Sequence, residues 1–566
     1  MNSHLRPILT LATAALLVAS CDRSAPEPGN QPESAPQTAP KAETKTSRAD
    51  LPGARIDRRQ PAAGTDVAPP VDWPRWGGNR TNNMISGAKG IPLDLTAGEK
   101  DGDGKVTGAE RARWVALLGS QSYGTPTIHK GRVLVGTNND SPRIESIEGD
   151  RGILYCLDEK TGELQWQFTV PKLPEGQPLD YEFVGICSSA LIDDERAYIV
   201  TNRCEIVCLD LDGQGDGNDG PFQDEGKYLA GGLSNLATAE PLEVGPKDAD
   251  IVWGYDMRNE LGVLPHNITS SSVVMAGGKI FATTSNGVDF SHINTPEPEA
   301  PCLIALNKDT GELLGEEASG ISKRLFHCNW SSPGAAVLNG KETVVFGAGD
   351  GYCYGFDANE FDVEEDGGQK FHLMKELWKV NCCPNSYRFD EKGEPIKYAT
   401  YPGPSEIVAS PVIYDDKVYV TIGQDPEDGD GVGCLTCFDP AKGNGDDAIV
   451  WQFKEISRSV STPSVVDGLV YAADFAGIVY CLDAATGELY WQHDSLSHIW
   501  SSTMVADGKV LVGNEDGELI ILKAGKEHEE LATIEFPDSI YSTAILANDT
   551  LYIQTMSHLY AFDLEK

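Results

Sequence analysis

Basic residues are scarce in this sequence. Its 566 residues contain 45 Lys and Arg against 86 Asp and Glu, a formal net charge of −41. Because such a surface repels a polyanion, the charge argues against nucleic acid as a partner. Beyond the amino terminus there is also no uninterrupted apolar stretch of the roughly 18 residues that would indicate a membrane-spanning helix. The 59 Gly and 34 Pro interrupt the chain too often for a helical bundle.

The amino terminus has the layout of an export signal. An apolar run from Ile8 to Val18 follows Arg6 and leads into small residues before Cys21, which predicts a secretory signal peptide over residues 1–20. The tetrad Val18-Ala19-Ser20-Cys21 resembles a bacterial lipobox, and the resemblance implies that Cys21 is lipidated. The alternative is an ordinary signal that is cleaved at a nearby small residue.

Residues 21–70 have the composition of a disordered tether. They are rich in Pro, Ala, Ser, Gln and Glu and lack hydrophobic periodicity, so they cannot bury enough apolar surface to offset the entropy of ordering. Together with the lipobox, they predict an exported cell-envelope lipoprotein on the periplasmic face of a membrane, held there by its lipid anchor alone. The choice between inner and outer membrane is left open.

From residue 120 onward one unit recurs eight times. Each copy has a small, mostly Ser- or Thr-containing opening, two apolar strands joined by a tight turn, and a third strand that often ends in Asp. Turn pairs such as Asp467-Gly468 tolerate the positive φ of tight hairpins. A fourth strand often carries Trp. The pattern predicts an all-β fold, an eight-bladed β-propeller of four-stranded antiparallel blades over residues 71–566. A β-solenoid would need shorter and more uniform repeats.

Closure of the ring is expected from the amino-terminal side. The last unit stops just after its third strand, and the segment Asp72-Trp73-Pro74-Arg75-Trp76 has no partner of its own. We therefore predict that this segment supplies the missing outer strand. Two stretches stand outside the repeat: an EF-hand-like insertion at residues 91–118 and an insertion in the second blade at residues 211–250.

The stretches Asp158 to Trp166 and Asp483 to Trp491 share a Thr-Gly-Glu-Leu core that ends in Trp. They resemble the tryptophan-docking repeat of the pyrroloquinoline-quinone-type (PQQ-like) eight-bladed propellers. That family includes a propeller lipoprotein of the outer-membrane barrel-assembly machinery and the quinoprotein dehydrogenases. The resemblance covers nearly all of residues 72–566 and implies that each indole packs against the neighbouring blade. The third unit departs from it, with Gly315 where the Trp belongs, and units four, five, seven and eight lack the full motif.

Long loops mark one end of the predicted propeller as its working face. The first-to-second turns are tight, whereas several second-to-third and fourth-to-first loops are long, and binding residues concentrate on such loops. Ten residues just before the inner strands are expected to rim the channel mouth there: Gln121, Tyr123, His266, Asn267, His327, Asn329, Glu406, Arg458, His498 and Trp500. Their mixture of polar, cationic and aromatic groups suits a planar anionic ligand or a peptide. Alternatively, each side chain satisfies loop backbone groups.

The stretch from Glu99 to Glu110 resembles a calcium loop. Carboxylates stand at Glu99, Asp101, Asp103 and Glu110, and Gly104 occupies the position of the sharp turn. This spacing is typical of the oxygen ligands of an EF-hand. Glu replaces Asp at the first position and the preceding helix is poor, so an unloaded acidic turn is the alternative. Calcium is accordingly the metal expected, at these four residues.

Cysteine chemistry points only weakly to a cofactor. Cys434 and Cys437 form a CxxC pair, but Phe438 follows where a c-type haem site needs His, and no second pair completes a zinc site. The adjacent Cys382 and Cys383 are similar to the vicinal pair of some quinoprotein alcohol dehydrogenases. That family's pair belongs to an early blade, however, and its calcium ligands and catalytic Asp have no match here. PQQ is therefore an alternative cofactor and not the favoured one.

The sequence offers no recognisable nucleophile, acid–base pair or cofactor constellation. We expect a non-catalytic, lipid-anchored propeller of the cell envelope that binds protein or peptide partners through its loop-rich face. Two alternatives remain: a PQQ- and Ca-dependent quinoprotein dehydrogenase of alcohols or sugars, and a glycan-binding propeller with Trp500 and Tyr123 as stacking surfaces. The oligomeric state is left open.

The lipid anchor can be tested by Cys21→Ser. Without the thiol no thioether-linked lipid can form, so the variant is expected to lose incorporation of radiolabelled palmitate and to leave the membrane fraction. Ser24→Ala keeps the thiol and is the matched control. Unchanged labelling and membrane retention of the Cys21→Ser protein would contradict the lipobox interpretation.

Overall fold

Antiparallel strands dominate the structure, a computed structural model that describes residues 72–427 and 431–565. The predicted signal peptide, Cys21 and the whole of the tether belong to a part of the chain outside the described residues, and they stay predictions. Among the described helices, none has both the length and the apolar character that crossing a membrane requires.

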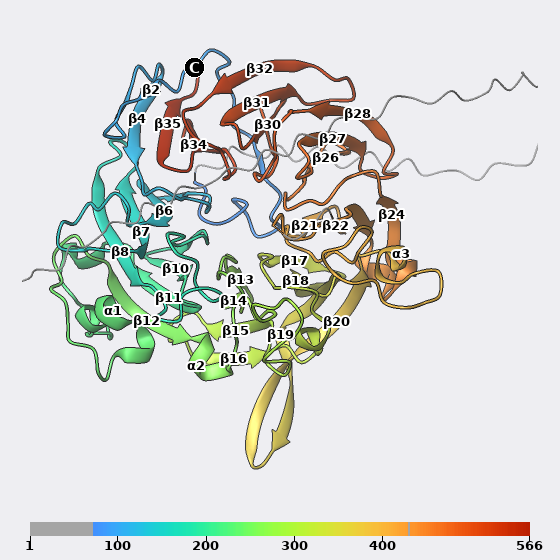
Figure 1. Cartoon of the computed structure of the whole chain (residues 1–566), viewed down its shortest axis with the longest axis horizontal. Coiled ribbons are helices and arrows are strands. Elements are labelled where there is room, and N and C mark those ends of the chain that lie inside the picture. The colour runs from blue at the N-terminus through green and yellow to red at the C-terminus, as the bar shows by residue number, and fades with distance from the viewer. Residues whose placement is uncertain (1–71, 428–430, 566) are drawn as a thin grey trace, which may run out of the picture. The chain divides into compact units, whose positions relative to one another are not determined.

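All but three strands of the described residues form eight four-stranded units, matching the eight openings in the sequence, and the third and fourth units are joined into one eight-stranded sheet. Figure 1 shows how the units follow one another around the ring. The first four blades are β5 (Thr127–His129), β6 (Arg132–Asn138), β7 (Arg151–Asp158) and β8 (Leu164–Pro171); β9 (Leu191–Asp193), β10 (Arg196–Val200), β11 (Glu205–Asp210) and β12 (Asp250–Asp256); β13 (Val274–Ala276), β14 (Lys279–Thr283), β15 (Leu303–Asn307) and β16 (Leu313–Glu316); and β17 (Gly334–Leu338), β18 (Lys341–Gly347), β19 (Tyr352–Asp366) and β20 (Gln369–Asn381).

The next three blades are β21 (Val412–Tyr414), β22 (Lys417–Ile422), β23 (Cys434–Phe438) and β24 (Ile449–Phe453); β25 (Ser464–Val466), β26 (Leu469–Ala473), β27 (Ile478–Asp483) and β28 (Leu489–Asp494); and β29 (Met504–Ala506), β30 (Lys509–Gly513), β31 (Glu518–Lys523) and β32 (Glu530–Glu535). The eighth contains β33 (Ile545–Ala547), β34 (Thr550–Gln554), β35 (His558–Asp563) and β4 (Ala112–Leu117). Each blade is an antiparallel meander, so the predicted all-β propeller class is confirmed.

A shared bulge explains the small residue that recurs near the end of seven of the eight third strands; the exception is Ile521, which lies opposite Ala532. In every blade the register between the third and fourth strands shifts directly after this position, as at Cys156 and Cys481. Cys156 lies opposite Trp166, and Cys481 lies opposite Trp491. A large side chain directly across from an indole would crowd the strand pair. The cysteines at this position therefore act as small buried residues.

The indoles dock onto the following blade. Trp166 Nε1 donates a hydrogen bond to the carbonyl of Leu211 at 2.9 Å, and Trp451 Nε1 donates to the carbonyl of Ala484 at 3.1 Å. The Gly of the next Thr-Gly turn lies flat against the ring: a Cβ on Gly487 would stand 2.6 Å from Trp451 Cδ2. Each docked indole thus buries the gap between two blades and satisfies its own N–H.

The strand that closes the ring is not the predicted one. β4 pairs with β35, and its Trp114 lies opposite Ala561 and donates to the carbonyl of Glu159 in the first blade at 2.9 Å. Trp114 thus takes the docking position of the other blades. The prediction that Asp72–Trp76 supplies the outer strand is wrong, because Trp73 instead bridges to the inner strand at Ile128. The closing strand β4 lies inside residues 91–118, the stretch predicted as an EF-hand-like insertion.

The segment that precedes β4 crosses the inner strands of six blades. Trp73 N donates to Ile128 O at 2.9 Å, and β1 (Ile85–Ser86) pairs in parallel with β29. Backbone groups of the blades bond to it between these points: Ile192 N to Pro74 O, Ala335 N to Arg80 O, Ile413 N to Thr81 O, Val465 N to Asn83 Oδ1 and Val505 N to Met84 O. The segment therefore ties the blades together from inside the ring.

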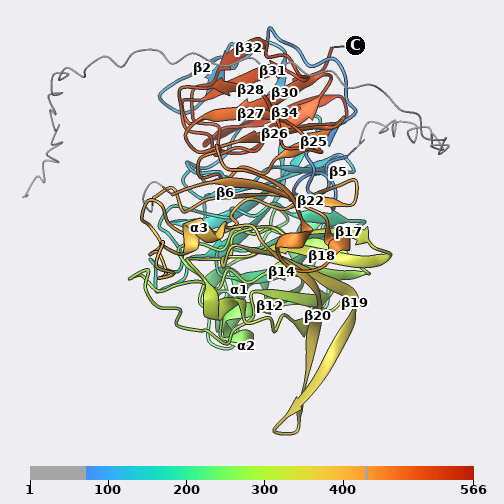
Figure 2. The same ribbon diagram turned by 90° about the vertical axis from the view of Figure 1, so that its right-hand side faces the viewer.

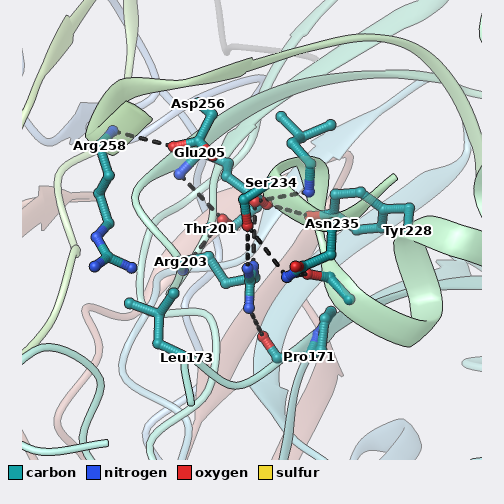
Figure 3. A network of polar contacts seen from close by, with 12 residues as sticks. Pro171, Leu173, Thr201, Arg203, Glu205, Tyr228, Ser234, Asn235, Asp256 and Arg258 are labelled. Atoms are coloured by element: carbon teal, nitrogen blue, oxygen red, sulfur yellow. Dashed lines mark hydrogen bonds and ion pairs between the residues drawn. The ribbon is translucent and has the colours of Figure 1, made fainter. Parts of the chain in front are cut away.

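Two additions extend the blades. The stretch between β11 and β12 contains η1 (Gly213–Gly215), α1 (Glu225–Gly231) and η2 (Leu233–Asn235). A buried network fastens it to the second blade, in which the Glu205 carboxylate accepts from Arg203 Nε at 3.1 Å, Tyr228 Oη at 2.8 Å and Leu233 N at 3.0 Å (Figure 3). Strands β19 and β20 form a long hairpin that projects beyond the blades (Figure 2).

The remaining short elements lie in connections. They are β2 (Glu99–Lys100), β3 (Val106–Thr107), α2 (Met257–Leu261), η3 (Ile321–Arg324), α3 (Asn385–Arg388), η4 (Pro440–Lys442) and η5 (Asp446–Ala448).

Gly487→Ala tests the docking contact. Gly487 and Gly468 have nearly the same φ, +73° and +75°, but a Cβ at Gly468 meets no atom within 4 Å. Gly468→Ala should lower the free energy of unfolding by about 1–2 kcal/mol, because an L-residue is strained in a left-handed conformation. Gly487→Ala should cost roughly 1–3 kcal/mol more, since the methyl group overpacks the Trp451 ring.

Thermal unfolding of both variants, followed by circular dichroism, measures the difference. Equal losses in Tm would contradict a tight contact between Gly487 and the indole.

Candidate functional site

A cavity of about 550 Å³ lies at the mouth of the channel. Its lining comes from the inner-strand openings and from long loops at the end that the loop lengths indicated. Six aromatic residues line it: Trp76, Tyr123, Tyr181, Trp330, Trp500 and Tyr541. Trp76 belongs to the segment that crosses the inner strands, and its Nε1 donates to Ser410 Oγ at 2.9 Å. The crossing segment thus contributes directly to the cavity.

Hydroxyl groups at the blade openings fix the cavity wall. Several of them accept a hydrogen bond from the backbone N–H of an adjacent blade's opening: Ser272 Oγ from Ser189 N (2.9 Å), Ser332 Oγ from Ser272 N (2.8 Å), Thr462 Oγ1 from Ser410 N (3.0 Å), Ser502 Oγ from Thr462 N (3.0 Å) and Thr543 Oγ1 from Ser502 N (3.0 Å). This chain of bonds explains why Ser and Thr recur at the openings. It makes the wall rigid and polar.

One side of the cavity is an aromatic stack. The rings of Tyr123 and Tyr541 are stacked with centroids 5.7 Å apart, and Trp500 lies 5.2 Å from Tyr541. Burial, together with the nearby Glu515 carboxylate, raises the pKa of Tyr541 to about 12. The phenol therefore stays neutral at physiological pH, and the stack offers a flat, uncharged surface.

The charges that line the cavity are all negative. Glu182, Asp425 and Glu427 are lining residues, and among the described lining side chains there is no Lys, Arg or His. Such a lining favours a cationic or neutral group over an anion.

The predicted rim residues separate into two groups. Gln121, Tyr123, Asn267 and Trp500 line the cavity. The other six do not: His266, His327, Asn329, Glu406, Arg458 and His498. Because the cationic candidates are in the second group, the cavity lacks the cationic side chains that suggested an anionic ligand.

Arg458 and His498 support the rim from outside. The Arg458 guanidinium lies 4.7 Å above the Phe475 ring, and its Nη2 donates to the carbonyl of Pro426 at 3.0 Å. The His498 ring stacks on the Phe475 ring, with centroids 4.4 Å apart. These contacts hold the loop that carries Asp425.

The two other histidines of the predicted rim, His266 and His327, form a cluster with the half-buried His292. His266 and His327 are fully buried and lie close to His292, with candidate ligand atoms of all three within 4.8 Å of one another. Trp330 lines the cavity and also contacts this cluster, with its ring 5.1 Å from that of His327. Sequence reasoning included His266 and His327 but missed His292, whose only signal is its place in a long loop. Burial and the neighbouring His327 lower the pKa of His266 to about 3, so its ring is neutral.

Asn329 and Glu406 are buried beside this cluster. The Asn329 side chain donates to the carbonyl of Asn286 at 2.8 Å and accepts from Gly349 N at 2.9 Å. Glu406 accepts from Cys328 N at 3.1 Å, and its Oε1 lies 3.5 Å from His327 Nδ1. Asn329 satisfies loop backbone groups, as the alternative interpretation of the rim proposed.

The predicted calcium residues lie on an exposed hairpin. β2 pairs with β3, and the described residues on either side contain no helix, unlike an EF-hand. Asp101 Oδ1 already accepts hydrogen bonds from Asp103 N and Lys105 N. Glu99, Asp101, Asp103 and Glu110 are all exposed, and calcium binding there stays a prediction.

The residues present do not suit PQQ in the cavity. PQQ is a tricarboxylate, and the charged lining residues are themselves carboxylates. Cys382 and Cys383 are free, fully buried and packed in the core between the fourth and fifth blades, away from the lining. The adjacent thiols therefore do not form the cover of a quinone ring.

Known proteins resemble parts of this chain. Residues 391–566 match the model of the family described as outer membrane protein assembly factor BamB. Two curated proteins match shorter parts. Quinohemoprotein alcohol dehydrogenase ADH-IIG of Pseudomonas putida is 29% identical over 142 residues, covering 21% of this chain and 20% of that protein. The 1-butanol dehydrogenase (cytochrome c) of Thauera butanivorans is 32% identical over 109 residues, covering 17% and 16%.

The chain thus aligns with no more than about a fifth of the length of these two relatives. Among solved structures, BamB from Moraxella catarrhalis has a TM-score of 0.49 at 14% identity, covering 80% of this chain and 98% of that chain. Quinohemoprotein alcohol dehydrogenase from Comamonas testosteroni has a TM-score of 0.45 at 13% identity, covering 88% and 81%. The family-model match and the two curated relatives together confirm the resemblance of this chain to the PQQ-like propellers.

Proposed function

We propose that this PQQ-like propeller is a non-catalytic, lipid-anchored protein of the cell envelope that binds protein or peptide partners through its loop-rich face. The observation that carries the proposal is the cavity at the channel mouth, with its aromatic stack and its purely acidic charge. The match of residues 391–566 to an assembly-factor family supports a binding role.

The cavity chemistry favours a basic side chain of the partner. A guanidinium or ammonium group gains from the faces of Trp500 and Tyr123 through cation–π attraction. It gains further from the carboxylates of Glu182 and Glu427, both exposed at the mouth. The net charge of −41 adds a long-range field that steers a basic partner toward the protein.

The quinoprotein alternative has less support. It rests on short stretches shared with two dehydrogenases, whereas the lining offers a carboxylate cofactor no cationic partner among the described residues. A glycan would also stack on Trp500 and Tyr123, but a neutral sugar would draw no benefit from the acidic groups.

Short fluorescent peptides that differ only in a central Arg, Gln or Glu test the binding role on the full-length protein. Fluorescence anisotropy should show the Arg peptide binding best and the Glu peptide worst, with the preference reduced at high salt by screening. The double variant Glu182→Gln, Glu427→Gln should bind the Arg peptide up to about tenfold more weakly, because each exposed ion pair contributes roughly 0.2–1 kcal/mol and about 1.4 kcal/mol corresponds to a factor of ten.

Glu365→Gln is the matched control, because Glu365 is exposed on the β19–β20 hairpin and is not a lining residue. It should leave every affinity unchanged. Equal binding of the three peptides would overturn the proposal. So would alcohol-dependent dye reduction after addition of PQQ and Ca²⁺, which would favour the dehydrogenase alternative.

A further inference from the structure

Three histidines from three separate segments meet beside the cavity wall. His266 lies before the third blade, His327 before the fourth, and His292 in the loop between β14 and β15. Their ring centroids are 4.4 to 5.1 Å apart. We propose that these three imidazoles bind one divalent transition-metal ion of the zinc type. The proposal is independent of the peptide-binding role.

His266 supplies the strongest evidence for a ligand. Its Nδ1 lies 2.7 Å from the carbonyl of Val288, to which it donates, so the lone pair is on Nε2. Nε2 is buried and has no hydrogen-bond partner among the described residues. A buried acceptor without a partner carries a free-energy cost in the folded state. A metal ion at Nε2 would remove this cost, and a backbone carbonyl at the other nitrogen is the usual support of a metal-bound imidazole.

The loop between β14 and β15 holds the three rings in place. Val288 accepts from His266 through its carbonyl and donates from its N–H to His327 O at 2.9 Å. At the next residue the chain turns around Asp289, whose Oδ2 accepts from Asn294 Nδ2 at 2.9 Å and whose carbonyl accepts from His292 N at 2.9 Å. The same short stretch thus joins two histidines and presents the third.

Glu406 orients His327. Its Oε1 lies 3.5 Å from His327 Nδ1, while its Oε2 accepts from Cys328 N and is fixed by that bond. A carboxylate beside Nδ1 favours the tautomer in which that nitrogen carries the proton, which leaves Nε2 for a metal. Tyr398 stacks on the His327 ring with centroids 5.3 Å apart and donates to Glu406 at 3.3 Å. The ring therefore has a supported orientation.

The donor set selects the class of ion. Imidazole nitrogens suit Zn²⁺ and neighbouring transition metals, whereas Ca²⁺ takes oxygen ligands. Nitrogens bound to one tetrahedral zinc at about 2.0–2.1 Å lie roughly 3.4 Å apart, closer than the 4.8 Å limit of this cluster. Binding therefore draws the rings together by about an ångström. His292 is half-buried on a loop and is the ring with most room to move.

The test is a titration of chelator-treated full-length protein with Zn²⁺ by calorimetry, and with Co²⁺ by visible absorption, which reports tetrahedral coordination. Both are run in a His528→Ala background, because His493 and His528 form a second, more exposed pair with nitrogens 3.1 Å apart. One ion should bind per chain, and Zn²⁺ should raise Tm by mass action. An excess of Ca²⁺ should not displace it.

His292→Ala should abolish the Co²⁺ absorption and the Zn²⁺-dependent rise in Tm, and its partly exposed position leaves the blade cores intact. Glu406→Gln should weaken Zn²⁺ binding by about 10–100-fold, as loss of a group that supports a metal ligand does. Asp101→Asn, in the predicted calcium loop, is the control and should change nothing. Zn²⁺ binding that survives in His292→Ala, or no Zn²⁺ binding in the parent protein, would show that the imidazoles are an aromatic packing cluster only.

Discussion

The contact between each outer-strand indole and the next blade is the interaction on which the ring depends. A four-stranded blade buries its faces only against its neighbours, so a blade with an unsealed edge leaves apolar surface in water. Trp114, Trp166 and Trp451 close this gap with the ring and satisfy the indole N–H on a carbonyl of the following blade. A bulge and a small residue opposite the indole make room for it.

Ring closure joins the first and last parts of the propeller through the same strand pairing and indole contact that join the other blades. β4 comes early in the sequence yet completes the last blade, and Trp114 docks onto the first blade as the other indoles dock onto theirs. The segment that crosses the inner strands adds a second closure from inside, where it also places Trp76 against Ser410. The cavity therefore depends on the amino-terminal part of the propeller as much as on the blades.

The polar groups at the channel mouth lie at two depths, with the carboxylates at the cavity surface and two of the imidazoles fully buried. Carboxylates and aromatic faces line the cavity, whereas the imidazoles form an inner layer next to Trp330, supported by Glu406. Water and salt screen the exposed carboxylates, so these charges attract a partner mainly once it is within about a Debye length, roughly 8–10 Å. In the inner layer His266 and His327 are fully buried, so their polar atoms need defined partners, whereas His292 is half-buried. A basic group of a partner in the cavity and a metal ion at the three histidines would therefore occupy different sites.

The repeat by itself determined the all-β class and the blade openings, because strand alternation and turn residues are local requirements. The docking role of Trp166 and Trp491 followed from the resemblance to the PQQ-like propellers. The repeat also indicated which end bears the cavity, since loop length is visible in the chain. Only the tertiary structure decided that β4 and not Trp73–Trp76 closes the ring, because several early segments can pair with one open edge. It also decided that His266 and His327 turn inward to meet His292 while Trp500 faces the cavity. Side chains next to one another along a rim point in directions set by loop hydrogen bonds, and residue type and spacing carry no record of those bonds.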